Sequence, residues 1–266
     1  MRVADVMSKG VVQVRPQDSA LEVGTFMDEK KVGAVVVVED GQIKGILSKE
    51  TFIAHIDDIL EKPIESLSVA DLMESDINHV TEDDDMMKAV ELLLTQKSIV
   101  DRLPVLSDGK VTGMVSKGDF ARLFLKSMRG KFKVASLMHY DPPTVFDYTP
   151  LTTVVAEMKS NPTKRFLVLS GDKLVGIISI RDLSLILFRQ RKYLKPVDPT
   201  STLTAEDIMT RNPITIQKKA DAAEAAKIMV ERNIGGIPVL EGRLDGIITR
   251  TDLMKGYQIA YMQSKI

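Results

Sequence analysis

Apolar and polar positions along this chain follow a pattern that predicts a buried strand running directly into a capped helix. The pattern is clearest at residues 246–253, Gly-Ile-Ile-Thr-Arg-Thr-Asp-Leu. Its β-branched apolar residues favour a strand. Thr249 is a typical helix cap, and Asp252 falls in the first helical turn, where the helix dipole favours a negative charge.

Three further copies of this pattern occur earlier in the chain. The glycines that open the copies are Gly45, Gly113, Gly176 and Gly246. The polar pairs at the predicted helix starts are Ser116 with Asp119, Ser179 with Asp182, and Thr249 with Asp252. The first copy instead has Ser48 followed by Thr51. The chain is therefore predicted to consist of four repeats of one unit.

The rest of each repeat keeps the same order of predicted elements. Each repeat opens with a short helix that carries a methionine near its end, at Met7, Met73, Met138 and Met209. A short strand and an amphipathic helix with a polar cap follow. Two apolar runs joined by a glycine-containing turn then predict a hairpin, whose second strand is the recurring pattern itself.

A unit of about 60 residues is marginally stable alone, so the repeats are expected to pack against one another. We predict an α/β fold of four repeats, each a small three-stranded sheet with two helices, associated as two pairs. The predicted repeats are residues 1–60, 66–126, 131–190 and 203–262, and the pairs are 1–128 and 129–266. Adjacent repeats are expected to pair through helix faces that contain Met27, Leu93, Met158 and Met229.

Composition narrows the classes of function. With 36 basic and 37 acidic residues, the chain gives no global electrostatic argument for binding nucleic acid or an anionic membrane. The absence of cysteine excludes disulfides and thiolate metal sites and fits a reducing, cytoplasmic location. No apolar run approaches the roughly 20 residues of a membrane helix, and the N-terminus does not resemble a secretory signal. We therefore expect a cytoplasmic protein without a membrane span.

No catalytic constellation stands out in the sequence. His55, His79 and His139 are isolated from one another and from other ligand-type residues. The acidic run at residues 83–85 is explained most simply as a helix cap. We therefore expect no metal site, no catalytic cofactor and no enzymatic activity.

The four-part unit, repeated in register, resembles the cystathionine-β-synthase (CBS) domain. In that family two units form a flat pair, the Bateman module, with clefts that bind adenosine compounds. The resemblance covers nearly the whole chain and implies a free-standing regulatory protein of two modules. It implies an adenine nucleotide (AMP, ADP or ATP) or another adenosyl ligand, a homodimer or other homo-oligomer, and an unknown protein target.

The residue types at the helix starts suit such a ligand. A carboxylate can accept hydrogen bonds from both ribose hydroxyls, and a Ser or Thr hydroxyl beside helix-start amides suits a phosphate. The resemblance implies that Asp119, Asp182 and Asp252 bind ribose, with Ser116, Ser179 and Thr249 beside them. It implies added phosphate charge from Lys117, Arg181 and Arg250. It places adenine against Asn78, Thr144 and Thr215, and against Leu103, Pro104, Ile237 and Pro238.

The repeats depart from the family pattern to different degrees. Repeat 1 has Thr51 in place of the carboxylate, and repeat 3 has Phe166 where repeats 2 and 4 begin a proline-containing phrase. Helix capping alone is the other explanation for the Ser/Thr and Asp pairs. Two other functions stay open: a scaffold with vestigial clefts, and nucleic-acid binding through the basic clusters at residues 126–133 and 189–195.

Overall fold

The computed structural model describes residues 1–95, 99–161, 164–189 and 203–265. Repeat 1 contains η1 (Val3–Asp5), β1 (Ser8–Lys9), β2 (Gln13–Val14), α1 (Ala20–Glu29), β3 (Ala34–Glu39), β4 (Gln42–Ser48), α2 (Lys49–Ala54), α3 (Ile56–Glu61) and η2 (Ile64–Ser66). Repeat 2 contains α4 (Val69–Leu72), β5 (Val80–Thr81), α5 (Met86–Thr95), β6 (Arg102–Ser107), β7 (Lys110–Ser116) and α6 (Lys117–Ser127).

The second half repeats this order. Repeat 3 contains η3 (Val134–Ser136), β8 (Thr144–Phe146), α7 (Leu151–Ser160), β9 (Arg165–Ser170), β10 (Lys173–Ser179) and α8 (Ile180–Arg189). Repeat 4 contains α9 (Ala205–Ile208), β11 (Thr210–Arg211), α10 (Ala222–Glu231), β12 (Gly236–Glu241), β13 (Arg243–Thr249) and α11 (Arg250–Gln263). The predicted α/β class and the four repeats are confirmed.

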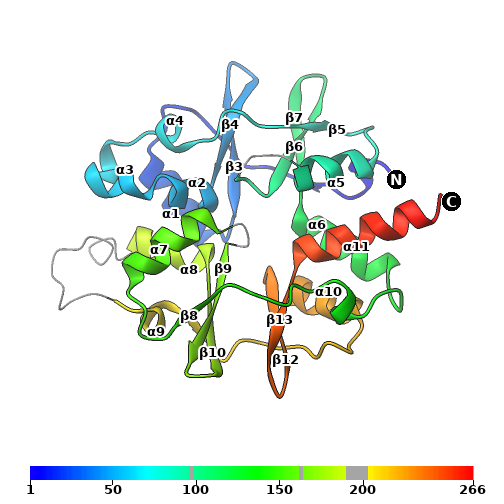
Figure 1. The fold of residues 1–266 in the computed structure, drawn as a ribbon. Helices are drawn as coiled ribbons and strands as arrows, with labels where there is room; N and C mark the ends of the chain where they lie inside the picture. The colour runs from blue at the N-terminus through cyan, green and yellow to red at the C-terminus, as the bar shows by residue number, and fades with distance from the viewer. Residues whose placement is uncertain (96–98, 162–163, 190–202, 266) are drawn as a thin grey trace.

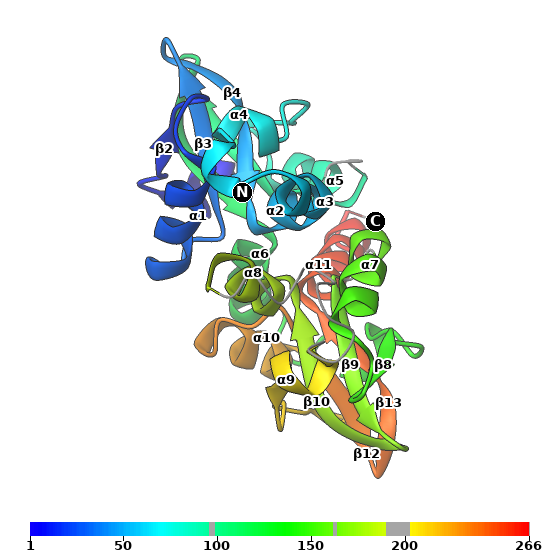
Figure 2. The same ribbon diagram turned by 90° about the vertical axis from the view of Figure 1, so that its left-hand side faces the viewer.

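Each repeat is built on an antiparallel hairpin, β3–β4, β6–β7, β9–β10 or β12–β13. In the first three repeats a short strand pairs parallel to the first hairpin strand, as β2 does with β3. The hairpins of repeats 1 and 2 point toward one end of the molecule and those of repeats 3 and 4 toward the other, with most of the helices between them (Figure 1, Figure 2).

Adjacent repeats exchange short segments. The residues after each opening helix leave their own repeat and pair with the second hairpin strand of the neighbouring repeat. Ser8 pairs with Met114 and Thr210 with Ile177, and a single bridge joins His139 to Ile247. An equivalent bridge joins Ile46 and Glu74. We call residues 7–9, 73–74, 138–139 and 209–211 the crossing segments.

The crossing segments explain why both the glycine and the methionine recur in every repeat. A Cβ atom added at Gly113 would collide with the Met7 sulfur, and one added at Gly246 would collide with the His139 carbonyl oxygen. The equivalent glycines of the other two repeats are covered in the same way. Repeats 1 and 2, and repeats 3 and 4, are therefore associated as two pairs.

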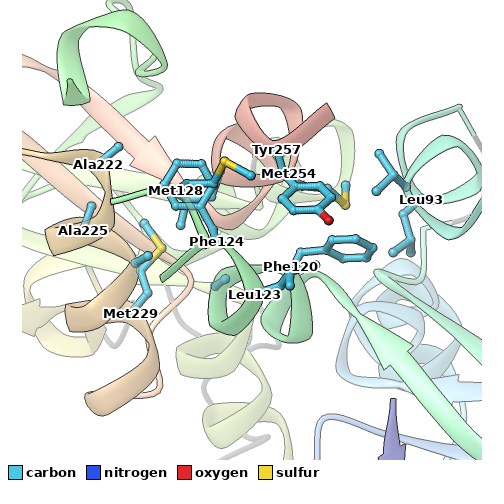
Figure 3. Close-up of a cluster of buried hydrophobic side chains, with 14 of the residues drawn as sticks. Leu93, Phe120, Leu123, Phe124, Met128, Ala222, Ala225, Met229, Met254 and Tyr257 are labelled. Carbon is cyan, nitrogen blue, oxygen red and sulfur yellow. The ribbon is translucent and has the colours of Figure 1, made fainter. Parts of the chain in front are cut away.

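Two hydrophobic clusters join these pairs to each other. In one cluster, α6 of repeat 2 packs against α10 and α11 of repeat 4 (Figure 3). The ring of Phe120 lies 6.4 Å from that of Tyr257 in this cluster. In the other cluster, α1 and α2 of repeat 1 pack against α8 of repeat 3.

The predicted pairing of adjacent repeats through helix faces is wrong. Met27 shares a cluster with Met158, and Leu93 shares one with Met229, so the helix faces join repeat 1 to repeat 3 and repeat 2 to repeat 4. Adjacent repeats are already joined by the crossing segments and by their second hairpin strands. Their apolar helix faces are therefore left to be covered by the other pair.

Candidate functional site

The carboxylates of Asp119, Asp182 and Asp252 are held by the helix starts that the sequence predicts. In each case the backbone N–H and the side-chain hydroxyl of the N-cap residue donate to the same oxygen, Oδ2. For Asp252 both distances, from Thr249 N and Thr249 Oγ1, are 2.7 Å. This reciprocal arrangement with the N-cap residue is a capping box, and it fixes the orientation of the carboxylate.

Repeat 1 keeps the cap but has Thr51 in place of the aspartate. The Thr51 hydroxyl accepts a hydrogen bond from Ser48 N at 3.0 Å and donates to Ser48 O at 2.9 Å. Thr51 is 1% exposed. The Thr51 hydroxyl is therefore satisfied within its own helix start. The carboxylate of this helix start is instead that of Glu50, in the first turn of α2, and its Oε2 is buried without a hydrogen-bond partner among the described residues.

The other oxygen of each carboxylate, Oδ1, contacts a crossing segment of the paired repeat. Ser8 Oγ donates to Asp119 at 3.1 Å, and Thr210 Oγ1 donates to Asp182 at 3.3 Å. His139 Nε2 lies 2.8 Å from Asp252 Oδ1. Sequence reasoning treated His139 as isolated and missed these contacts. The signal that could have found them is a polar residue directly after the recurring methionine.

A cavity of about 730 Å³ lies where the helix starts of the four repeats meet. Its polar lining includes Lys49 of α2, Arg122 of α6, Arg181 of α8 and Arg250 of α11. In total, eight basic side chains line it: Lys31, Lys49, Arg102, Arg122, Lys164, Arg165, Arg181 and Arg250. Four acidic side chains line it: Asp28, Glu50, Asp101 and Asp182. We call this the central cavity, and its excess of positive charge suits an anionic ligand.

The pKa values of buried cations reflect this crowding. Burial and the neighbouring charges of Arg165 and Arg102 lower the pKa of Arg250 to about 10. Burial also lowers the pKa of Lys49, Lys164 and Arg165. Within the described part of the chain, Arg102 Nε and Arg250 Nε are buried without a hydrogen-bond partner. An anion entering the cavity would stabilise these charges and provide acceptors for such donors.

Three of the cavity arginines, Arg102, Arg122 and Arg165, were not predicted from the sequence. Arg102 and Arg165 occupy the same position in repeats 2 and 3, at the start of the first hairpin strand. A Cβ added at Gly33 would collide with Arg102, and one added at Gly235 would collide with Arg165. Each of these two arginines therefore lies over a glycine of the paired repeat. The available signal was an arginine that recurs at one position of repeats 2 and 3 and a glycine that recurs one position earlier in repeats 1 and 4.

A second cavity of about 570 Å³ is lined by residues of repeat 3 alone. It is lined by His139, Thr144 and Phe166, by the end of α7, and by residues just before β8. Because His139 also contacts Asp252, this cavity lies beside the carboxylate of repeat 4. The predicted adenine residue Thr144 therefore lines the same cavity as the histidine that contacts Asp252, although Asp252 itself belongs to repeat 4 and does not line this cavity.

The predicted site residues fall into three groups. The central cavity is lined by Ser116, Ser179, Arg181, Asp182, Pro238 and Arg250. Thr144 lines the second cavity, while Asp119, Thr249 and Asp252 are buried at their helix starts. None of these three buried residues lines either cavity. The same holds for the remaining predicted residues: Asn78 and Thr215, which are exposed, Leu103, Pro104 and Ile237, which are buried in hairpin strands, and Lys117. Lys117 Nζ lies 2.5 Å from Asp101 Oδ1.

Other expectations concern metals, membranes and basic clusters. In the part of the chain that the structure describes, no group of three or more His, Cys, Asp or Glu side chains is placed to hold a metal ion. No helix among the described residues combines the length and apolar character needed to cross a membrane. Most of the basic cluster at residues 189–195 lies outside the described residues.

Comparison with known proteins adds the following findings. A family model for the CBS domain matches residues 3–58, 69–126, 134–189 and 205–258. An uncharacterized protein of Methanocaldococcus jannaschii is 26% identical over 264 residues, which are 95% of this chain and 61% of that relative's length. A CBS domain-containing protein of Dictyostelium discoideum is 35% identical over 130 residues, which are 47% of this chain and 90% of that protein.

Solved structures with the same fold cover the chain almost completely. The crystal structure of another Methanocaldococcus jannaschii protein, described as a candidate archaeal homolog of γ-AMPK, has a TM-score of 0.87 at 24% identity. The match covers 97% of this chain and 100% of that one. An uncharacterized conserved protein from Pyrococcus horikoshii has a TM-score of 0.66 at 24% identity, with 96% of this chain and 99% of that chain covered.

Proposed function

The chain belongs to the CBS-domain family, and on that premise we propose that it is a regulatory protein that binds adenine nucleotides. In this proposal Asp182 and Asp252, and under a further condition Asp119, bind the ribose hydroxyls. The phosphates lie in the central cavity among the arginines and lysines that line it. The bound chain then passes the nucleotide state to a protein partner.

The observation that carries this proposal is the position of Asp182. Its carboxylate lines the central cavity together with Ser179 and Arg181, so a hydrogen-bond acceptor stands beside an N-cap hydroxyl and a cation. A nucleotide needs the acceptor for its ribose hydroxyls, and it needs the hydroxyl and the cation for its phosphate. Helix capping explains the contacts at Oδ2, but it gives no reason for buried cations to converge from four repeats.

The charge of the cavity favours some adenosyl ligands over others. AMP, ADP and ATP carry the negative charge that eight basic side chains against four acidic ones would attract. S-adenosylmethionine carries a sulfonium cation instead, and placing that charge beside Arg250 would add to the existing repulsion. We therefore propose an adenine nucleotide rather than S-adenosylmethionine as the ligand.

A thermal-shift series tests the proposal directly. AMP, ADP, ATP, adenosine and S-adenosylmethionine are each titrated against the full chain. A ligand present at about 100 times its dissociation constant adds about 2.7 kcal/mol to the free energy of unfolding, so the nucleotides are expected to raise the melting temperature and S-adenosylmethionine to leave it nearly unchanged. If no adenine nucleotide stabilises the chain, the proposed function is wrong.

A scaffold function is the second candidate, and a specific observation favours it. Repeat 1 has lost its carboxylate, and Thr51 is satisfied within its own helix start. Nucleic-acid binding through the clusters at residues 126–133 and 189–195 stays a prediction, and none of the eight basic side chains of the central cavity belongs to those clusters. A homo-oligomer, a protein target and a cytoplasmic location stay predictions. The helix faces that join the two pairs are already buried within this chain.

A further inference from the structure

The three carboxylates differ in how many acceptor positions they have left. A carboxylate has about four lone-pair positions. Among the described residues, Asp182 accepts from Ser179 N, Ser179 Oγ and Thr210 Oγ1, so one position is open. Asp252 has the same number of contacts, with His139 in the place of the threonine. Both can receive one ribose hydroxyl without losing a contact.

Asp119 has no position left. Oδ2 accepts from Ser116 N at 2.8 Å and Ser116 Oγ at 2.6 Å, and Oδ1 accepts from Ser8 Oγ at 3.1 Å. The fourth position is taken by the Arg122 guanidinium, which also lies 3.4 Å from Ser8 Oγ. Asp119 does not line the central cavity, whereas Ser116, Gly118 and Arg122 around it do.

The contact from Arg122 is particular to repeat 2. Arg122 lies three residues after the carboxylate on α6. The equivalent residue is Leu185 in repeat 3, which cannot form an ion pair, and Lys255 in repeat 4, which is exposed. The motif of repeat 2 is intact in sequence, yet its carboxylate is closed by a side chain that the motif does not include.

Arg122 is also placed to leave Asp119 when an anion is present. Its side chain is 51% exposed, against 2% for Asp119, and it lines the central cavity. Arg122 is close enough to Arg250 for its charge to disfavour the charged form of that buried guanidinium. A phosphate in the cavity could bind both guanidinium groups, and movement of Arg122 toward it would free one acceptor position on Asp119.

We propose that Arg122 makes the repeat 2 site selective for phosphorylated ligands, because it closes the Asp119 carboxylate until a phosphate in the central cavity binds it. This inference rests on the proposed function and assigns a specificity to one of its three carboxylates. A nucleoside without phosphate must break the Arg122–Asp119 pair unaided. A nucleotide replaces that pair with a guanidinium–phosphate contact.

The test isolates repeat 2 in the full chain. Asp182→Asn and Asp252→Asn together leave Asp119 as the remaining ribose carboxylate, and ligand-free melting verifies that this background is folded. Dissociation constants for adenosine and AMP are then measured by calorimetry with Arg122 intact and with Arg122→Gln. Lys255→Gln, at the equivalent position of repeat 4, is the matched control.

Arg122→Gln is expected to tighten adenosine binding about 10-fold or more, because a charge-assisted hydrogen bond no longer has to be broken. AMP is expected to gain less or to weaken, so the ratio of the adenosine to the AMP dissociation constant falls. Arg122→Lys should restore much of the ratio, and Lys255→Gln should leave it unchanged. Loss of stability alone would not move this ratio.

Equal changes for adenosine and AMP, or weaker adenosine binding in Arg122→Gln, would overturn the inference and leave Arg122 a simple phosphate ligand. The inference would also be overturned if the double Asp→Asn chain bound no AMP, either with Arg122 intact or with Arg122→Gln. The wild-type chain is titrated with AMP in parallel, so that failure of the repeat 2 inference can be distinguished from failure of the proposed function. If wild type binds AMP while the repeat 2 background does not, only the selectivity of repeat 2 is refuted.

Discussion

At the scale of the residue, Arg250 combines a cost to the ligand-free fold with a proposed role in binding nucleotide phosphate. Its pKa is lowered to about 10 by burial and by neighbouring positive charges, so its folded-state value lies below its ordinary value. The unfolded chain therefore binds this proton more tightly than the folded chain does, and the charge lowers stability at every pH below about 10. The lost free energy of unfolding would be regained only as the pH rises above about 10, where Arg250 loses its proton in the folded chain.

Replacing Arg250 by Gln should therefore affect stability and binding in opposite directions. The ligand-free melting temperature is expected to rise, because one charge is removed from a crowded cluster. AMP affinity is expected to fall about 10- to 100-fold, because a charge-assisted hydrogen bond to phosphate is lost. Arg243→Gln, an exposed change in the same repeat, is the control and should alter neither quantity. A lower melting temperature with unchanged AMP affinity would assign Arg250 a purely structural role.

At the scale of the element, the crossing segments connect the sequence motifs to the site. One short stretch places a methionine on the glycine of the paired repeat and then a hydroxyl or imidazole on its carboxylate. Each of the three carboxylates that we propose as ribose ligands is therefore held from two repeats at once. The orientation of a carboxylate on one repeat thus depends on the position of the paired repeat.

Gly246→Ala tests the close packing of a crossing segment. The added Cβ would collide with the backbone carbonyl of His139, which is not a flexible side-chain end. Overpacking of this kind costs about 1–3 kcal/mol, measured as a lower urea midpoint. Gly118→Ala, in α6, is the control and should cost little, because an added Cβ there first meets the flexible end of the Arg250 side chain, at 3.3 Å, and Ala favours a helix more than Gly does. An equal or smaller loss at Gly246 than at Gly118 would contradict the packing described here.

Much of each repeat could be predicted from the sequence, because its signals are local. Helix caps such as Ser179 with Asp182 depend on residues three positions apart, and hairpins depend on short turns between apolar runs. The contacts between repeats could not be predicted in this way. Nothing near Met27 says that it shares a core with Met158, and nothing near His139 points to Asp252, because each partner is set by how whole repeats assemble.

At the scale of the whole molecule, the four repeats close around the central cavity because each pair covers the helix faces of the other. The cluster shared by repeats 2 and 4 and the cluster shared by repeats 1 and 3 both cross the boundary between the pairs. The cavity therefore receives cations from all four repeats. Neither pair alone contains the complete set.

A fragment of residues 129–266 tests whether the pair formed by repeats 3 and 4 needs the other pair to cover its apolar helix faces. Separated from the other pair, it exposes the apolar faces around Met158 and Met229, which are both 0% exposed in the intact chain. The fragment is expected to associate with a second copy of itself, because contiguous apolar surface of this kind drives association. Sedimentation velocity measures the outcome. A fragment that stays monomeric at tens of micromolar and unfolds cooperatively would show that the pairs are independent.

The most direct test of the proposed nucleotide sites is calorimetric titration of AMP into four chains: wild type, Asp182→Asn, Asp252→Asn and Thr51→Ser. Asn keeps the size of the side chain, and its amide oxygen can still accept the hydrogen bonds from the N-cap residue, so ligand-free melting should change little. Each Asp→Asn change is predicted to weaken AMP at its own site about 10- to 100-fold, while Thr51→Ser leaves binding as in wild type. If both Asp→Asn variants bind AMP as wild type does, these residues only cap their helices and the nucleotide-site assignment is wrong.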